Sequence, residues 1–572
     1  MGMKLIRDEP EVSKQLNYWI TSWRPYLVVV IVGLLVFGRT VFFGYTYFDD
    51  DIFILRHFNW IEKFSSILLA FQKVHFGSYY RPFLTVSLII DAQISGQAPW
   101  MYHCSNVVYH LVASCLVFRL LSKLQFSGFI ALAMSLVFVI HPLVTQSVAW
   151  ILGRNESILA IFVLLSMISY LNYGSSKQSK YLFIHFLFFL LALLTKETAL
   201  VVPLLIIFYN RLVAREWLVS KSPVTLIVGW LTATSIWYFL RQVSLNGTQI
   251  GIDTFTLSAF FTNLRVLLEA FGKMLIPLQL SPYPTYSVVP TFIGIAIIMF
   301  FIVSFVAWKK SVNKLTMFAI AWIVLFIIPS LFVHIFDAEH RFNYLEYRFY
   351  GSTIGFSIFL ASVFQNKFHR FGWIKKILLL VVLLSYIAVT INYSEVFRDP
   401  LSHWEHAVRM SPESADVYYN LGIVSIEVAK DPERAEENYR KAISLNGSNP
   451  EYHYNLGTIY IRQNLAELAR EEFERTTKLD PSNLFALYNL GNLNFLINDL
   501  REAERYWKKA LDVDSNFVYA EMRLVELYTR EGKHDDAQYY NDRLQRAGYQ
   551  LQSTKKKGNE NLSPDSARST NN

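Results

Sequence analysis

The sequence has little charge and little cysteine for its length of 572 residues. Asp, Glu, Lys and Arg make up only 17% of the chain, whereas hydrophobic residues make up 53% and aromatic residues 16%. This composition excludes an ordinary soluble enzyme, because a soluble fold of this size needs more polar surface. The two cysteines, Cys104 and Cys115, lie eleven residues apart on one expected helix. That separation is too long for a disulfide bond between them.

Three further absences narrow the class of protein. After about residue 395 no apolar run is long enough to cross a bilayer. No group of His, Cys, Asp and Glu has a spacing typical of metal ligands, so neither a metal nor a cofactor is predicted. A metal held by the aspartates of residues 49–51 stays an open alternative. The early and late apolar segments do not repeat one another, which disfavours a transporter built by internal duplication.

Before residue 395, successive apolar runs predict eleven membrane-spanning helices. A spanning helix needs about 20 mostly apolar residues. The runs centre on 25–43, 101–121, 126–141, 155–172, 181–194, 198–212, 223–240, 289–308, 315–333, 348–365 and 377–392. With residues 1–24 in the cytoplasm, the cytoplasmic pieces hold 18 Lys and Arg in 67 residues, a higher density than the outer pieces. This positive-inside bias explains the net charge of +8 without a nucleic-acid partner, and it predicts an extracytoplasmic C-terminal part.

One apolar segment, residues 258–280, does not fit this alternation. It carries four polar residues at nearly helical spacing: Asn263, Arg265, Glu269 and Lys273. We interpret it as an interfacial or re-entrant helix that returns to the outer side. The alternative is a twelfth span, which would reverse the orientation of everything after it. The lysine cluster at 309–314 favours the first interpretation.

The C-terminal third repeats itself with a period of about 34 residues. Leucines and alanines recur in register at Leu421, Leu456, Leu490 and Leu524, and at Ala435, Ala469, Ala503 and Ala537. A helical hairpin of this length, with small residues where its helices cross, resembles the tetratricopeptide repeat. Four copies cover about 414–548 within a predicted domain at 400–548, and residues 404–407 resemble the second helix of a partial copy.

Stacked repeats of this kind form a concave groove that binds peptides or proteins. The sequence therefore predicts a protein or peptide partner in the repeat groove, with a spacer or dimerisation arm as the alternative. Residues 549–572 are polar and low in complexity, and they are predicted to be disordered.

Three consecutive carboxylates follow the first predicted span, in the large outer loop 44–100. Asp49, Asp50 and Asp51 are costly at a membrane surface unless they are solvated, paired or used. Their mutual repulsion raises the pKa of at least one of them towards a value suited to a general base. The alternative is an acidic loop end that only follows the charge rule of membrane topology.

Other outer loops place cations, acids and a histidine near the ends of successive predicted helices. These candidates are Arg81, His141, Arg154, Glu156, Lys196, Glu197, Arg341, Tyr344 and Arg348. Together they predict one outward-facing cavity in which Arg and Lys bind the phosphate of a donor. Each cation could instead anchor its helix at the membrane surface. The two glutamates could simply pair with Arg154 and Lys196, and His141 could end a helix before Pro142.

Six phrases of the sequence occur in a characteristic order. They are FDDDIFIL, YYRPFLTVSLIIDAQISG, HPLVTQSVAWILGRNE, LTKETALVVP, LSPYPTY and HRFNYLEYRFYG. With the spans and the repeats, they resemble membrane glycosyltransferases of the GT-C fold that carry tetratricopeptide repeats, the transmembrane-and-TPR O-mannosyltransferase-like family. The resemblance covers nearly all of residues 25–548. The chain departs from bacterial members after Lys196 and at Glu346, where a proline is usual, which leaves the acceptor open.

The resemblance implies an all-α fold, with a GT-C-like transmembrane domain at 25–395 followed by a repeat superhelix. It implies an inverting transfer of a sugar, with mannose the best guess, from a polyprenyl-phosphate donor to an acceptor hydroxyl such as a protein Ser or Thr. Asp49 would take the proton of that hydroxyl and Asp50 would orient it, with Asp51 a solvated neighbour. The expected location is a bacterial inner membrane, or an ER membrane in a eukaryote. The alternative function is a membrane-anchored repeat scaffold with a degenerate site.

Overall fold

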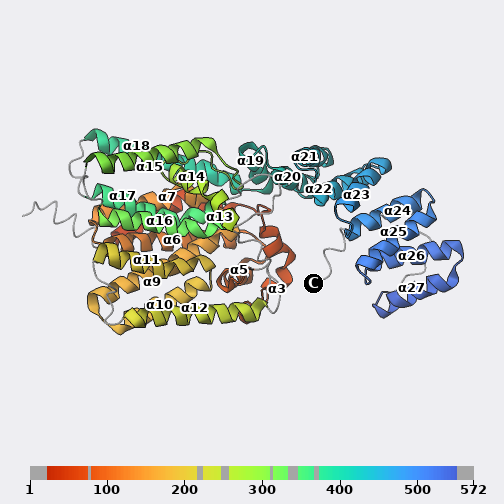
Figure 1. Ribbon diagram of the computed structural model, residues 1–572, viewed down its shortest axis with the longest axis horizontal. Coiled ribbons are helices and arrows are strands. Elements are labelled where there is room, and N and C mark those ends of the chain that lie inside the picture. The colour runs from red at the N-terminus through yellow and green to blue at the C-terminus, as the bar shows by residue number, and fades with distance from the viewer. Residues whose placement is uncertain are drawn as a thin grey trace, which may run out of the picture. The chain divides into compact units, whose positions relative to one another are not determined.

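The structure is a computed structural model that describes residues 22–74, 79–214, 223–245, 257–308, 313–332, 345–365 and 373–549 (Figure 1). Every regular element in these ranges is helical, which confirms the predicted all-α class. The chain divides into two compact units, Met1–Ser411 and Pro412–Asn572. The domain boundaries predicted from the sequence stay predictions.

Long apolar helices dominate the first unit. Among the described residues, seven helices are long and apolar enough to cross a membrane, and the bent pair α7 and α8 makes an eighth if it forms one span. The seven, some with short extensions, are α2 (Arg24–Phe37), α6 (Trp100–Lys123), α9 (Arg154–Ser176), α11 (Val202–Tyr209), α12 (Pro223–Leu245), α16 (Lys314–Leu331) and α18 (Trp373–Ser394). Figure 1 shows most of them lying roughly parallel.

Of the other four predicted spans, the one at 289–308 counts only over Val288–Met299, as a shorter apolar helix, and three form helices too short to count by themselves. These three are α7 (Gly128–Ile140), α10 (Ser179–Leu193) and α17 (Tyr350–Phe364). Helix α7 stops at His141 because the residue before a proline favours extended backbone, and the chain bends by 51° into α8 (Thr145–Ala149). The span count of eleven therefore stays a prediction.

Large apolar side chains on several helices face outward. On α12, Leu231 is 62% exposed and Phe239 is 66% exposed, and α18 likewise exposes Leu380 and Leu384. An apolar surface of this extent is stable only against lipid or another protein. With the candidate spans, it makes the chain a multi-pass membrane protein.

The interior of the first unit is a bundle in which α6, α7, α9 and α17 pack against one another. The predicted segment 258–280 forms two short helices, α13 (Leu257–Asn263) and α14 (Arg265–Leu275). Neither is among the candidate spans, and the interfacial interpretation stays a prediction. Helix α14 packs along α15 (Val288–Trp308).

The predicted outer loop 44–100 is itself largely helical. It contains the π-helix η2 (Asp51–Arg56), the single turns α3 (Phe58–Ile61) and α4 (Ser66–Leu69), and the longer α5 (Pro82–Ser95). Apolar residues fill one side of α5, where Leu84, Leu88 and Ile89 are buried. Sequence reasoning missed α5 as an element of the core because its 14 residues are too few to span a bilayer.

The second unit is a stack of helical hairpins, as the repeat register predicted. Its helices are α20 (Ala415–Glu427), α21 (Pro432–Leu445), α22 (Pro450–Arg462), α23 (Ala466–Leu479), α24 (Leu484–Leu496), α25 (Leu500–Val513), α26 (Val518–Glu531) and α27 (His534–Arg546). All eight registered leucines and alanines are buried. Gly491 lies so close to the ring of Trp507 that a Cβ there would clash with it, which explains why a glycine follows the leucine.

Candidate functional site

The acidic segment leaves the first span in an unusual backbone conformation. Tyr47 and Asp49 both have left-handed backbones, with φ of 56° and 69°, and Phe48 lies between them. Directly afterwards, residues 51–56 form a π-helix. Left-handed non-glycine residues and π-helical turns both cost energy and are enriched at functional sites. The backbone conformation therefore indicates a functional loop, independently of the charges of its residues.

The three aspartates occupy different environments. Asp49 is solvent-exposed, yet neighbouring protein atoms remove part of the water from its carboxylate and Asp51 repels it, which together raise its pKa to about 6. Asp50 is buried, and its Oδ2 accepts hydrogen bonds from the backbone N (2.8 Å) and the hydroxyl (2.9 Å) of Thr46. Burial nevertheless raises the pKa of Asp50 to about 7.

Asp51 does not match the expected solvated neighbour. Its exposed fraction is only 7%, and its Oδ2 lies 3.1 Å from the guanidinium of Arg56. The π-helix accounts for this difference, because it turns Asp51 inward and brings Arg56, five residues later, over it. Of the three carboxylates, Asp49 is thus the one that an incoming hydroxyl can reach.

A line of aromatic rings connects the acidic loop to cations from other loops. Phe48 contacts Trp150 with ring centroids 5.0 Å apart, and Trp150 contacts Tyr347 at 5.3 Å. Two cations lie near the ring of Tyr347: Lys196 Nζ is 5.4 Å from its centroid and the Arg348 guanidinium is 5.9 Å away. The fold thereby brings together predicted site residues that are up to about 300 positions apart in sequence.

Two ion pairs, one buried and one partly exposed, involve or adjoin these cations. Lys196 pairs with Glu156, and Arg81 pairs with Glu197 at 2.7 Å. The sequence left open that the two glutamates pair with Arg154 and Lys196; Lys196 does pair with one of them, Glu156, whereas Glu197 pairs with Arg81. Lys196 and Glu197 are consecutive at the start of η5 (Glu197–Val201) but point to different neighbours. Each glutamate therefore pairs with a cation from a distant segment. In each pair, the carboxylate partly neutralises the cation and holds it in place.

Arg154 serves as a structural hub. Its fully buried guanidinium donates to Asp91 at 2.5 Å, to Asn106 at 2.8 Å and to the carbonyl of Tyr102 at 2.5 Å. These bonds join α5, α6 and α9, and they leave the side chain no exposed surface for a ligand. The geometry favours this structural role over the predicted phosphate contact. Asp91 was missed because it stands alone within the apolar run of α5.

His141 is likewise committed to the fold. It is fully buried, its Nδ1 accepts from the N–H of Leu143 at 3.2 Å, and its Nε2 lies 2.9 Å from the carbonyl of Met274. With both ring nitrogens in use, the structure favours the helix-ending role. Arg348 is half-buried and makes no ion pair among the described residues. The predicted residues Arg341 and Tyr344 lie outside the described residues.

A buried ionic triad escaped the sequence analysis as a unit. Lys273 lies 3.1 Å from Glu269 and 2.6 Å from Glu346, and none of the three side chains is exposed by more than 1%. Tyr393 donates to Glu346 at 3.2 Å. The four-residue spacing had marked Glu269 and Lys273, whereas Glu346 stood out only as a departure from the proline usual in similar sequences. The triad ties α14 to η8 (Glu346–Phe349).

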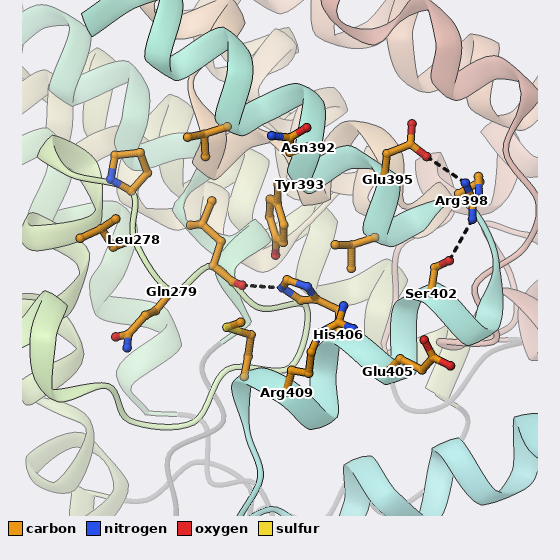
Figure 2. Close-up of a pocket in the computed structure, with 15 residues that line it drawn as sticks. Leu278, Gln279, Asn392, Tyr393, Glu395, Arg398, Ser402, Glu405, His406 and Arg409 are labelled. Carbon is orange, nitrogen blue, oxygen red and sulfur yellow. Dashed lines mark hydrogen bonds and ion pairs between the residues drawn. The ribbon is translucent and has the colours of Figure 1, made fainter. Parts of the chain in front are cut away.

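A separate cavity of about 500 Å³ lies between the loop 277–280, the end of α18 and α19 (Pro400–Met410) (Figure 2). Its charged lining comprises Arg398, Arg409, Glu395 and Glu405, so the formal charges cancel. His406 lies near its centre, with Nε2 2.9 Å from the carbonyl of Leu280. Two other residues of α19, His403 and Trp404, contact Phe48 of the acidic loop.

No metal site is recognisable in the described part of the chain. Within it, no three His, Cys, Asp or Glu side chains gather as metal ligands would. Asp50 and Asp51 are engaged by Thr46 and Arg56, so the aspartates do not converge on one point. The expectation that the site uses no metal stays a prediction.

Comparisons with known proteins bear on both units. A tetratricopeptide-repeat family profile matches residues 429–484, which confirms the repeats. The protein O-mannosyl-transferase TMTC2 of Mus musculus is 30% identical over 158 residues, 26% of this chain and 19% of that protein. A protein O-mannosyl-transferase of Caenorhabditis elegans is 26% identical over 394 residues, 64% of this chain and 54% of that protein. The chain is similar to protein O-mannosyl-transferases.

This similarity confirms the resemblance predicted from the sequence phrases. The chain nevertheless spans only about a fifth of the length of the mouse protein and about half of the nematode protein. Solved structures align with the chain only in part. The crystal structure of MamA, with 19% identity and a TM-score of 0.25, covers 26% of this chain and 90% of MamA. Pseudomonas aeruginosa pilF, with 25% identity and a TM-score of 0.25, covers 28% and 70%.

Proposed function

We propose that this chain is an inverting glycosyltransferase that moves a sugar, mannose in the first instance, from a polyprenyl-phosphate donor to a protein Ser or Thr hydroxyl on the extracytoplasmic side of a membrane. The observation that carries the proposal is the exposed Asp49 carboxylate, with a pKa raised to about 6, beside the buried Asp50. The protein O-mannosyl-transferases to which the chain is similar support the class of reaction and acceptor.

In this proposal Asp49 acts as the general base. A base works best when its pKa lies near the operating pH, because it must be ionised and still hold the proton firmly. Asp49 takes the proton of the acceptor hydroxyl while the oxygen attacks the anomeric carbon. Asp50, bonded to Thr46, holds the loop that carries Asp49. The bond from the sugar to the phosphate oxygen breaks, and the configuration at the anomeric carbon inverts.

The leaving phosphate gains negative charge as that bond breaks. Fixed cations stabilise such charge most effectively when they are held in place before the reaction. Two candidates lie near the ring of Tyr347: Lys196, held by Glu156, and Arg348, which has no ion pair among the described residues. Arg81, paired with Glu197, is a third candidate. Arg341 and Tyr344 keep their proposed roles from the sequence.

The test is transfer of labelled mannose from a polyprenyl-phosphate donor to a Ser- and Thr-containing peptide by the purified full chain. We expect the wild type to transfer label and Asp49→Asn to lose at least about 100-fold in rate, as general bases typically contribute 10²–10⁴-fold. The matched control is Glu62→Gln, which removes an exposed carboxylate from the same outer segment.

Wild-type-like turnover by Asp49→Asn would contradict the assignment of the base. Full activity of Glu62→Gln is required for the loss to be attributed to Asp49. If the folded wild type transfers no sugar from any polyprenyl-phosphate donor, the chain is better described as a membrane-anchored repeat scaffold.

A further inference from the structure

The ring of Phe48 anchors the strained acidic loop. Its two neighbours in sequence, Tyr47 and Asp49, are both left-handed, a conformation that persists only where surrounding contacts impose it. Four rings surround Phe48, with centroid distances of 5.0 Å to Trp150, 6.3 Å to Tyr283, 5.4 Å to His403 and 5.7 Å to Trp404. Trp150 also donates to the carbonyl of Phe48 at 2.9 Å.

Two of these four rings come from α19, the last helix of the first unit. His403 and Trp404 are almost completely buried. Among the described residues, neither ring nitrogen of His403 nor the indole nitrogen of Trp404 has a hydrogen-bond partner. A buried polar atom without a partner is costly. Side-chain hydrogen bonds therefore do not account for the position of these two rings. Their contribution lies in the faces of the rings, which contact Phe48 and each other.

The same helix is also tied to the loop through the backbone. The N–H of Gly44, at the start of the loop, donates to the carbonyl of Arg398 at 2.8 Å. Asp399 then caps α19 by accepting from the N–H of Ser402 at 2.8 Å. The start of the loop and the ring at its centre therefore both rest on the segment 398–404. A shift of this segment moves Asp49 with it.

We propose that His403 and Trp404 are positioning residues that hold the Asp49–Asp50 loop in its reactive conformation by packing against Phe48. This inference rests on the proposed transferase function for its kinetic consequence, although the conformational consequence is independent of it. Neither residue touches the reacting groups. Displacing a catalytic group by about 1 Å can cost about 100-fold in rate, so loosening this packing is enough to impair catalysis.

The experiment compares three variants of the full chain with the wild type: His403→Ala, His403→Phe and Arg409→Ala. His403→Ala removes the ring, whereas His403→Phe keeps a ring and removes only nitrogens that have no described partner. Arg409→Ala is the control, because Arg409 is exposed on α19 and lines the cavity of Figure 2. Two quantities are measured: hydrogen exchange of residues 44–56, and kcat and KM for the donor.

We expect His403→Ala to increase exchange in 44–56 and to lower kcat about 10- to 100-fold with little change in KM. His403→Phe should restore most of both properties, and Arg409→Ala should resemble the wild type. Trp404→Phe and Trp404→Ala provide a second pair should His403→Ala fail to fold. Unchanged exchange in the alanine variants would overturn the inference, as would failure of both phenylalanine variants to restore the loop. If exchange behaves as expected but the wild type transfers no sugar, the proposed function fails and the positioning role stands.

Discussion

At the scale of single residues, the three consecutive aspartates differ in their exposure and in the groups that hold them. Asp49 is exposed, Asp50 is buried on Thr46, and Asp51 is held by Arg56. Only Asp49 combines access with a pKa near neutrality. The identity of the base is therefore set by the backbone conformation of the loop, because all three residues offer the same carboxylate.

This difference predicts the pH dependence of transfer. Asp49 must be ionised to accept a proton, and the partial loss of water around its carboxylate and the repulsion by Asp51 raise its pKa to about 6. We therefore expect kcat/KM to fall about tenfold for each pH unit below about pH 6 and to level off above about pH 7. The pKa of the neighbouring Asp50 lies close by, at about 7, so the observed midpoint reports both carboxylates. A pH–rate profile that stays flat from pH 5 to 8 would contradict Asp49 as the base.

Other residues of the expected site turned out to stabilise the fold. Arg154 and Asp91 form a buried pair, and removing one partner of such a pair typically costs about 3–5 kcal/mol. Lys196 and Arg81 also pair with carboxylates. However, Glu197, the partner of Arg81, is partly exposed, and Lys196 also lies near the ring of Tyr347. A cation near a membrane surface can thus be a ligand or a structural tie, and burial decides between the two.

At the scale of elements, the repeats depend on close contacts between paired helices. Gly491 on α24 faces the ring of Trp507 on α25, and a Cβ at this position would overlap the indole. Trp507 also donates to the carbonyl of Tyr488 at 3.3 Å. The pair can be separated only by moving one helix or turning the indole away.

We expect Gly491→Ala to destabilise this hairpin by about 1–3 kcal/mol, the usual cost of overpacking. Hydrogen exchange in the full chain should accelerate in α24 and α25 while α20 and α21 stay protected. Gly447→Ala is the control, because a Cβ there would meet only the carbonyl of Ile443, at 3.4 Å. Equal effects of the two substitutions would show that the close contact is not what limits the repeat.

At the scale of the whole molecule, the position of α19 predicts how truncations behave. A chain that ends after Ser411 keeps α19 and its contacts with the acidic loop but loses the repeats. We expect it to hydrolyse the donor at a rate within about threefold of the full chain while transfer to a protein acceptor falls at least about tenfold, as loss of one binding surface worth 1.4 kcal/mol or more would produce. A chain that ends after Asp399 should lose both activities.

Rates of hydrolysis and transfer, measured side by side for the two truncations and the full chain, distinguish these outcomes. Equal loss of both activities on removal of residues 412–572 would indicate that the repeats only stabilise the fold. Full transfer by the shorter truncation would contradict the role assigned to α19.

Local pattern determined much of this protein. The sequence alone revealed the apolar runs, the register of leucines and alanines, and the three aspartates after the first span. These features are recognisable because hydrophobic periodicity and composition act over a few turns of chain. The tertiary structure decided the partners. Arg81 meets Glu197 across 116 residues, Arg154 meets Asp91 across 63, and Phe48 meets His403. Which of several nearby charges or rings come together depends on how the helices pack, and helices of similar hydrophobicity leave that packing unspecified until the whole bundle forms.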